Sequence, residues 1–190
     1  MSDDLARTLR QLGLLLDGSL GLTRAISLVL GDTAARPLRD GTAVAPTDVI
    51  DAPPMIRELL RVAVENGTTP EVLGRVADGL DSGVAAGDGL RAFTFVLGEF
   101  VAAGSTFGRA FAAMATADGQ LSPAMRALAD DAARACEDGG AICDTMDRHP
   151  AVVPEWYRAV FREFEVAGRS SEATFRVLLA GLDDRAFGGA

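Results

Sequence analysis

The chain has 190 residues, of which 48% are hydrophobic and 24% charged, and its formal net charge at pH 7 is −9. This composition is typical of a folded protein rather than a disordered one, and the negative charge argues against nucleic acid or an anionic membrane surface as a partner. All 18 basic residues are arginine, which excludes a phosphate-binding loop with its lysine and any Schiff-base chemistry.

Three features of the sequence indicate a cytoplasmic protein that does not insert into a membrane. The first four residues, Met-Ser-Asp-Asp, are acidic where a secretory signal would be positively charged. No stretch approaches the run of about 18 apolar residues that a membrane span needs. The two cysteines, Cys136 and Cys143, are typical of free thiols in a reducing compartment.

In the first part of the chain, apolar residues recur at helical spacing. Residues 32–52 interrupt this pattern, and their prolines and glycine predict one short helical turn within a loop. The predicted helices cover residues 5–16, residues 22–30, and two stretches within 53–80 that meet at Gly67.

The glycine-rich segment 83–90 is the expected linker. Beyond it the helical spacing resumes, and Ser122-Pro123 is a typical helix start because a hydroxyl residue precedes a proline in the first turn. No β-type alternation appears, so we expect an all-α fold. The predicted helices cover residues 93–101, 107–114, 123–136 and 142–146, and two stretches within 154–182 that meet at Gly168.

One helix–glycine–helix segment occurs twice, over residues 53–80 and 154–182. In each copy the glycine ends one helix, and a hydroxyl residue and a glutamate begin the next. When Gly67 is aligned with Gly168, the identical pairs are Pro53/Pro154, Arg57/Arg158, Arg61/Arg162, Glu71/Glu172, Arg75/Arg176 and Val76/Val177.

We interpret the chain as a tandem duplication of an antiparallel helical bundle, with a shortened copy over residues 2–82 and a fuller copy over 91–185. The shortened copy lacks a counterpart of the helix over 123–136. One flank of that helix is therefore expected to stay exposed, around Met125, Leu128 and Ala132, as a docking site for a partner or a second chain. The structural corners are predicted at Gly18, Gly104, Gly67 and Gly168.

Four motifs of the second copy follow the order found in one known family. They are Phe93-x-Phe95 with Ala103-Gly104-Ser105-x-Phe107-x-x-Ala110-Phe111, then Glu137-x-Gly139-x-x-Ile142, then His149-Pro150-x-x-Val153-Pro154, and finally Glu165-x-x-Gly168. The second copy resembles the cytoplasmic helical domain of the F-type inner-membrane platform proteins of type II secretion and type IV pilus machines. The first copy shares this resemblance only at its two ends.

The resemblance implies a non-enzymatic scaffold that acts through protein–protein interaction and needs no cofactor. The partners of the family are an assembly ATPase and other platform subunits, and a homodimer is a further alternative. The transmembrane helices that normally follow each domain of the family are missing from this sequence. We therefore expect a cytoplasmic adaptor module without direct membrane insertion.

The alternative is a small cytoplasmic enzyme that uses carboxylates in a cleft between helices. It requires Glu65, Glu165 or His149 to converge with another polar group. The sequence pattern favours structural roles. We expect Glu165 to accept hydrogen bonds from the helix that follows Gly168, and His149 to cap the short helix that ends near Asp147.

Two cysteines and one histidine do not make a convincing metal site. Cys136 and Cys143 lie on apolar helix faces, and six residues separate them, which is not the tight spacing of a zinc knuckle. We therefore expect buried structural cysteines, with no catalytic, cofactor-binding or metal-binding residue in the chain.

Two arginine pairs occupy equivalent positions in the two copies. Arg57 and Arg61 lie four residues apart on one helical face, as do Arg158 and Arg162. Together with Glu165 they are the candidate partner-binding residues, because an acidic partner surface would fit them. Pairing with glutamates of the same chain (Glu58, Glu65, Glu155 or Glu165) explains the arginines equally well.

Overall fold

The structure is a computed structural model of residues 1–190. It describes the whole chain except residues 1, 43–45, 88, 118, 169 and 188–190. The side chains of residues 2, 46, 86 and 185–187 are also outside the description. The described residues form eleven α-helices and two short 3-10 helices and contain no strand. The predicted all-α fold is confirmed. No helix in this described part of the chain combines the length and the apolar character needed to cross a membrane.

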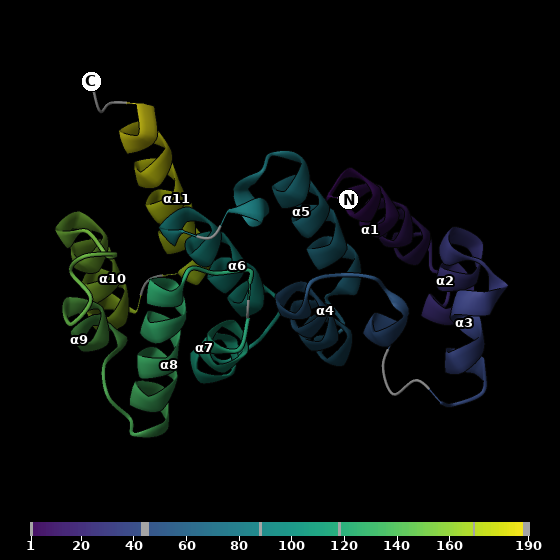
Figure 1. Ribbon diagram of the computed structural model, residues 1–190, viewed down its shortest axis with the longest axis horizontal. Coiled ribbons are helices and arrows are strands. Elements are labelled where there is room, and N and C mark those ends of the chain that lie inside the picture. Colours follow the sequence, from purple (N-terminus) through teal and green to yellow (C-terminus); the bar gives the residue numbers. More distant parts are fainter. Residues whose placement is uncertain (1, 43–45, 88, 118, 169, 188–190) are drawn as a thin grey trace. The chain divides into compact units, whose positions relative to one another are not determined.

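The chain divides into two compact units, residues 1–86 and 87–190. In the first unit, α1 packs against both α2 and α5, and α5 also packs against α4 (Figure 1). The buried interior of this unit is aliphatic, with Leu9, Leu12 and Leu59 fully enclosed. Its elements are α1 (Ser2–Asp17), α2 (Leu22–Leu30), α3 (Asp32–Arg39), η1 (Pro46–Val49), α4 (Pro54–Asn66), α5 (Thr69–Asp81) and η2 (Val84–Ala86).

In the second unit, the helices pack as a chain of neighbours. Helix α6 contacts α7 and α11, α8 contacts α7 and α9, and α10 contacts α9 and α11 (Figure 1). The elements are α6 (Leu90–Ala102), α7 (Phe107–Ala115), α8 (Pro123–Glu137), α9 (Ile142–Asp147), α10 (Glu155–Ala167) and α11 (Ser171–Phe187).

Aromatic rings fill the core of the second unit. The ring of Phe161 lies 6.1 Å from that of Phe107 and 6.4 Å from that of Phe175, so one side chain of α10 joins α7 to α11. Tyr157 is fully buried, and its hydroxyl lies 2.9 Å from Oγ1 of Thr94. Since Thr94 donates its own hydrogen to the Leu90 carbonyl, Tyr157 is the donor in this pair.

The glycines at the two repeated corners adopt left-handed backbone. Gly67 has φ 71° and Gly168 has φ 59°, and each ends its helix with a hydrogen bond back to the last turn. Glycine adopts this region without the strain that a Cβ introduces. Gly104 also has a positive φ of 90°, but at the corner after α1 the left-handed residue is Ser19 and not Gly18.

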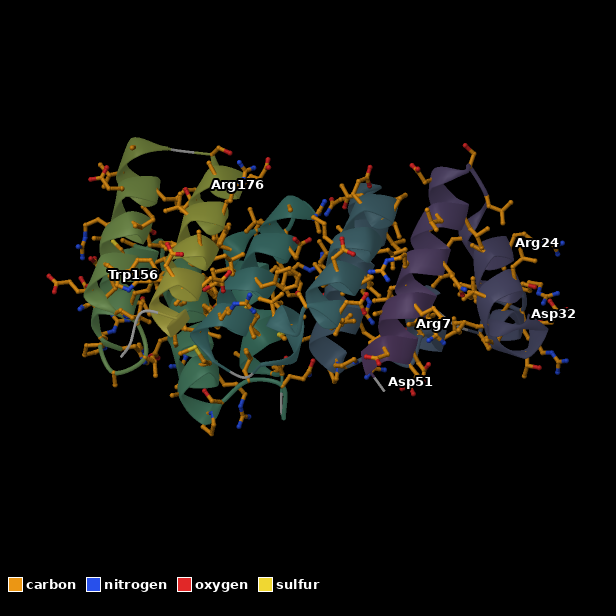
Figure 2. All side chains as sticks on the ribbon, turned by 90° about the horizontal axis from the view of Figure 1, so that it is seen from above. Arg7, Arg24, Asp32, Asp51, Trp156 and Arg176 are labelled. Carbon is orange, nitrogen blue, oxygen red and sulfur yellow. The ribbon has the colours of Figure 1, made fainter. Side chains whose placement is uncertain are left out.

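Glycine also lets α10 and α11 approach closely. A Cβ added at Gly181 would lie 2.8 Å from two atoms of the Trp156 ring. Figure 2 shows Trp156 between these two helices. Because Trp156 is the only tryptophan of the chain, its fluorescence reports on the second unit alone.

Two loop predictions differ from the structure. The segment 32–52 contains the eight-residue helix α3, which has Pro37 in its interior. Proline weakens a helix because it cannot donate a backbone hydrogen bond, but Asp32 accepts a 2.7 Å bond from Arg39 across the whole of α3 and Ala35 is buried. Within the predicted linker 83–90, η2 packs on α5 and Val84 is buried.

The predicted exposure of one flank of α8 is wrong. Met125, Leu128 and Ala132 are at most 2% exposed, because α8 packs along α7 of the same unit. The start of α8 agrees with the prediction, since the Ser122 hydroxyl accepts a hydrogen bond from the Met125 backbone at 3.4 Å.

The two units share part of their contact pattern. In each, the first helix packs against both the second and the last, and the helix before the glycine corner packs against the helix after it. Helix α3 also packs on α2 as α8 packs on α7, and η1 contacts α3 and α4 as α9 contacts α8 and α10. The prediction that the helix over 123–136 has no counterpart in the first copy is therefore wrong, because the eight-residue α3 takes the corresponding place. This arrangement is what a duplication with a shortened first copy would produce, and the duplication itself stays a prediction.

Candidate functional site

An open groove of about 610 Å³ lies in the second unit. It forms where α7 and α9 begin and where α8 and α10 end. Gly108 brings α7 close to α8, since a Cβ there would lie 3.3 Å from Cβ of Cys136. The lining residues are Thr106, Phe107, Gly108, Arg109, Ala112, Cys136, Glu137, Gly139, Gly140, Ile142 and Glu165.

Helix ends shape the mouth of this groove. Thr106 caps α7 by accepting a hydrogen bond from the Arg109 backbone at 3.3 Å. At the other side, Gly139 adopts φ 71° and the Gly140 backbone donates to the Ala135 carbonyl at 2.7 Å. The chain therefore turns sharply after α8, and the space beside α7 stays open.

Glu165 forms one wall of the groove and holds α9 in place. Its two carboxylate oxygens accept hydrogen bonds from the backbone N–H groups of Ile142, at 2.7 Å, and Cys143, at 2.9 Å. Helix α9 has only six residues, and its N-cap, Ala141, has no capping side chain. Glu165 supplies that cap from α10, and its negative charge suits a helix N-terminus.

The expected partner of Glu165 was therefore wrong. We expected the carboxylate to cap the helix that follows Gly168, which is α11, whereas it caps α9. Glu165 lies three residues before the corner and reaches sideways to a neighbouring helix. Spacing along the sequence does not reveal such a contact, because α9 begins 23 residues earlier in the chain.

Both cysteines lie near Glu165 but are poor nucleophiles. Burial, and then the Glu165 carboxylate, raise the pKa of the Cys143 thiol to about 11. The same two causes raise the pKa of the half-buried Cys136. Both side chains are therefore neutral thiols near pH 7. Among the described residues, no three His, Cys, Asp or Glu side chains gather in a way that could hold a metal ion.

The arginine pair of α10 binds an aspartate of α9. Arg158 donates to one oxygen of Asp147 at 3.1 Å, and Arg162 donates to the other at 2.5 Å. The predicted partners of these arginines were glutamates, and no spacing in the sequence indicates Asp147. These arginines join the C-terminal end of α9 to α10, whereas Glu165 binds the N-terminal end of α9.

In the first unit, Arg61 of the arginine pair has partners in the same chain. Arg61 donates to Glu58 at 2.7 Å and forms a 3.5 Å ion pair with Asp48. Arg57 is half-buried on α4, and its guanidinium makes no hydrogen bond or ion pair to another described residue. Of the two alternatives for Arg61, pairing within the chain or binding to a partner, the structure shows pairing within the chain.

His149 does not cap α9 with its ring. Its Nε2 lies 2.8 Å from the Asp131 carboxylate of α8, which also accepts a 3.2 Å hydrogen bond from Arg134. Asp131 is thus a bridging residue rather than a purely solvated charge. The ring ties the turn after α9 to α8, and His149 is absent from the lining of the groove.

The three candidate acid–base residues do not share the groove. Glu65 lies on α4 in the first unit, and of Glu65, Glu165 and His149 only Glu165 lines the groove. Gly108, which lets α7 approach α8, was not selected from the sequence. Its position in the first turn of a helix could have indicated the contact, because glycine permits close approach of the backbone.

The fold and the groove define an all-α protein with an open surface groove in its second unit. The chain matches no family model, no curated protein and no solved structure. The resemblance to the platform proteins therefore stays a prediction from the four sequence motifs.

Proposed function

We propose that the protein is a non-enzymatic helical scaffold that acts through protein–protein interaction, with the groove around Glu165 as its binding surface. The observation that carries this proposal is the engagement of both Glu165 oxygens by the backbone of α9. These two bonds give Glu165 a structural role between α9 and α10 at the edge of the groove.

The character of the groove supports the same function. Its lining mixes the apolar side chains of Phe107 and Ile142 with the charged side chains of Arg109 and Glu137. Protein interfaces combine an apolar centre with a polar rim in this way. An enzyme pocket for a small molecule would enclose its substrate, whereas this groove is open along the ends of four helices.

The resemblance to platform proteins supplies the first partners to test. They are an assembly ATPase and other platform subunits, with the cytoplasm as the proposed compartment. A second copy of the chain is the next candidate. The acid–base enzyme is less well supported, because it needs acid–base residues that converge in a closed cleft, whereas of Glu65, Glu165 and His149 only Glu165 lines the open groove.

Ala112 provides the experiment. Its side chain is exposed and lines the groove, so Ala112→Arg adds bulk and charge to the binding surface without changing a buried contact. Affinity-tagged protein is crosslinked in its native cells, and co-purified proteins are quantified by mass spectrometry. We expect Ala112→Arg to reduce recovery of the partner by about tenfold or more, which corresponds to the loss of one central interface contact.

The matched control is Ala159→Arg. Ala159 is exposed on α10 and does not line the groove, so this variant carries the same added charge at another surface and should recover the partner normally. Equal recovery by the two variants would show that the groove is not the binding surface.

A further inference from the structure

A second surface feature belongs to the first unit and shares no lining residue with the Glu165 groove. It is a notch of about 230 Å³ between α1 and α5. Its lining includes Gly13, Gly74 and Leu14, and Leu14 is 69% exposed. A cavity of about 150 Å³ with an apolar lining is large enough to bind benzene, so the notch has room for an aromatic ring.

The notch exists because Gly74 has no side chain. Helix α1 approaches α5 closely at Gly13, where an added Cβ would lie 3.3 Å from the Pro70 carbonyl oxygen and 3.4 Å from Cβ of Leu73. At Gly74, by contrast, an added Cβ would meet no atom within 4 Å. A side chain at position 74 would therefore extend into open space.

The second unit shows which side chain suits this position. Phe175 lies seven residues after Gly168, just as Gly74 lies seven residues after Gly67. Phe175 is 5% exposed, and its Cγ would lie 3.1 Å from a Cβ added at Gly98 of α6. In the second unit, then, a phenylalanine of the last helix packs over a glycine of the first helix, and in the first unit that phenylalanine is missing.

The charges at the rim indicate what should flank the ring. Arg10 is engaged by Asp78 and Asp81, each at 2.8 Å. Asp17 and Glu71 also line the notch, and neither carboxylate forms a hydrogen bond or ion pair with another described residue. The rim is thus negative, which favours a cationic neighbour. The net charge of −9 disfavours a second copy of this chain as the occupant.

We propose that the notch between α1 and α5 binds an aromatic side chain of a separate partner protein, flanked in that partner by arginine or lysine. The ring takes the place that Phe175 occupies in the second unit, and the flanking cations face Asp17 and Glu71. This interaction is independent of the groove around Glu165.

The probe is the peptide acetyl-Gly-Arg-Phe-Arg-Gly-amide, titrated into isotope-labelled full-length protein. The amide NMR signals of Gly13 and Gly74 report binding in the notch. We expect saturable shifts at both signals. Replacing the phenylalanine of the peptide by alanine should weaken binding by about tenfold or more, given the value of burying an aromatic side chain. Replacing both arginines by glutamate should also weaken it.

Variants at position 74 show whether the notch itself is the site. Gly74→Phe should fill the notch from within, raise the melting temperature above that of Gly74→Ala and abolish peptide binding. Gly74→Ala, the matched control, adds only a methyl group and should still bind. A Gly74→Phe protein that does not fold, or that melts below Gly74→Ala, would show that a ring does not fit there and would overturn the proposal.

Two further results would also contradict it. One is the absence of saturable shifts at Gly13 and Gly74 with the phenylalanine peptide. The other is a wild-type dimer in sedimentation that Gly74→Phe converts to a monomer, because the occupant would then be a second copy of this chain.

Discussion

Replacing Phe161 with alanine is expected to lower the free energy of unfolding of the second unit by about 3–5 kcal/mol, the usual cost of removing a fully buried phenylalanine. The Phe161 ring is fully buried. Its centroid lies 5.5 Å from that of Phe164, 6.1 Å from that of Phe107 and 6.4 Å from that of Phe175. The substitution leaves a cavity between α7, α10 and α11, which these rings cannot close without leaving their own contacts.

Urea unfolding followed by Trp156 fluorescence measures this loss in the second unit. Phe161→Leu is the control, because it keeps most of the apolar volume and should cost less than about 1.5 kcal/mol. A loss below about 1 kcal/mol for Phe161→Ala would mean that the aromatic cluster does not hold these three helices together.

Replacing Glu165 with alanine should lower the same free energy of unfolding by about 2 kcal/mol. The substitution removes the shared acceptor of the Ile142 and Cys143 backbone N–H groups. Hydrogen bonds to a charged group contribute about 1.5–3 kcal/mol each, and partial exposure of Glu165 reduces their sum. The expected result is a loosened α9 and a groove that has lost one wall.

Glu163→Ala is the matched control for this prediction. Glu163 is exposed on the same helix and makes no hydrogen bond or ion pair to another described residue, so its loss should cost within about 0.5 kcal/mol. Hydrogen exchange gives a second readout. The amides of Ile142 and Cys143 should exchange faster in Glu165→Ala and not in Glu163→Ala. Equal behaviour of the two variants would contradict the capping role.

Most helices could be predicted because their signals are local. Ser122-Pro123 begins α8, and Gly67 and Gly168 end α4 and α10 by adopting positive φ. Each such signal depends on a residue and its near neighbours. Helix α3 was not predicted because Pro37 indicates a loop when only neighbouring residues are compared. The hydrogen bond that stabilises the helix joins Asp32 to Arg39, at its two ends.

The candidate site could be predicted only in part. Glu165 was selected correctly as a residue that accepts backbone hydrogen bonds, but α9 instead of α11 supplies the donors. Likewise, nothing in the sequence links Asp147 to Arg158 and Arg162. These contacts depend on which helices become neighbours, and that is decided by the packing of the whole unit.

Site-specific photocrosslinking tests most directly whether the groove binds another protein. The photoreactive residue p-benzoyl-phenylalanine is placed at position 112 inside the groove or at position 159 on the exposed face of α10, and cells are irradiated. The scaffold function predicts one discrete crosslinked protein from position 112 and none from position 159. No crosslink from position 112, or the same products from both positions, would contradict it.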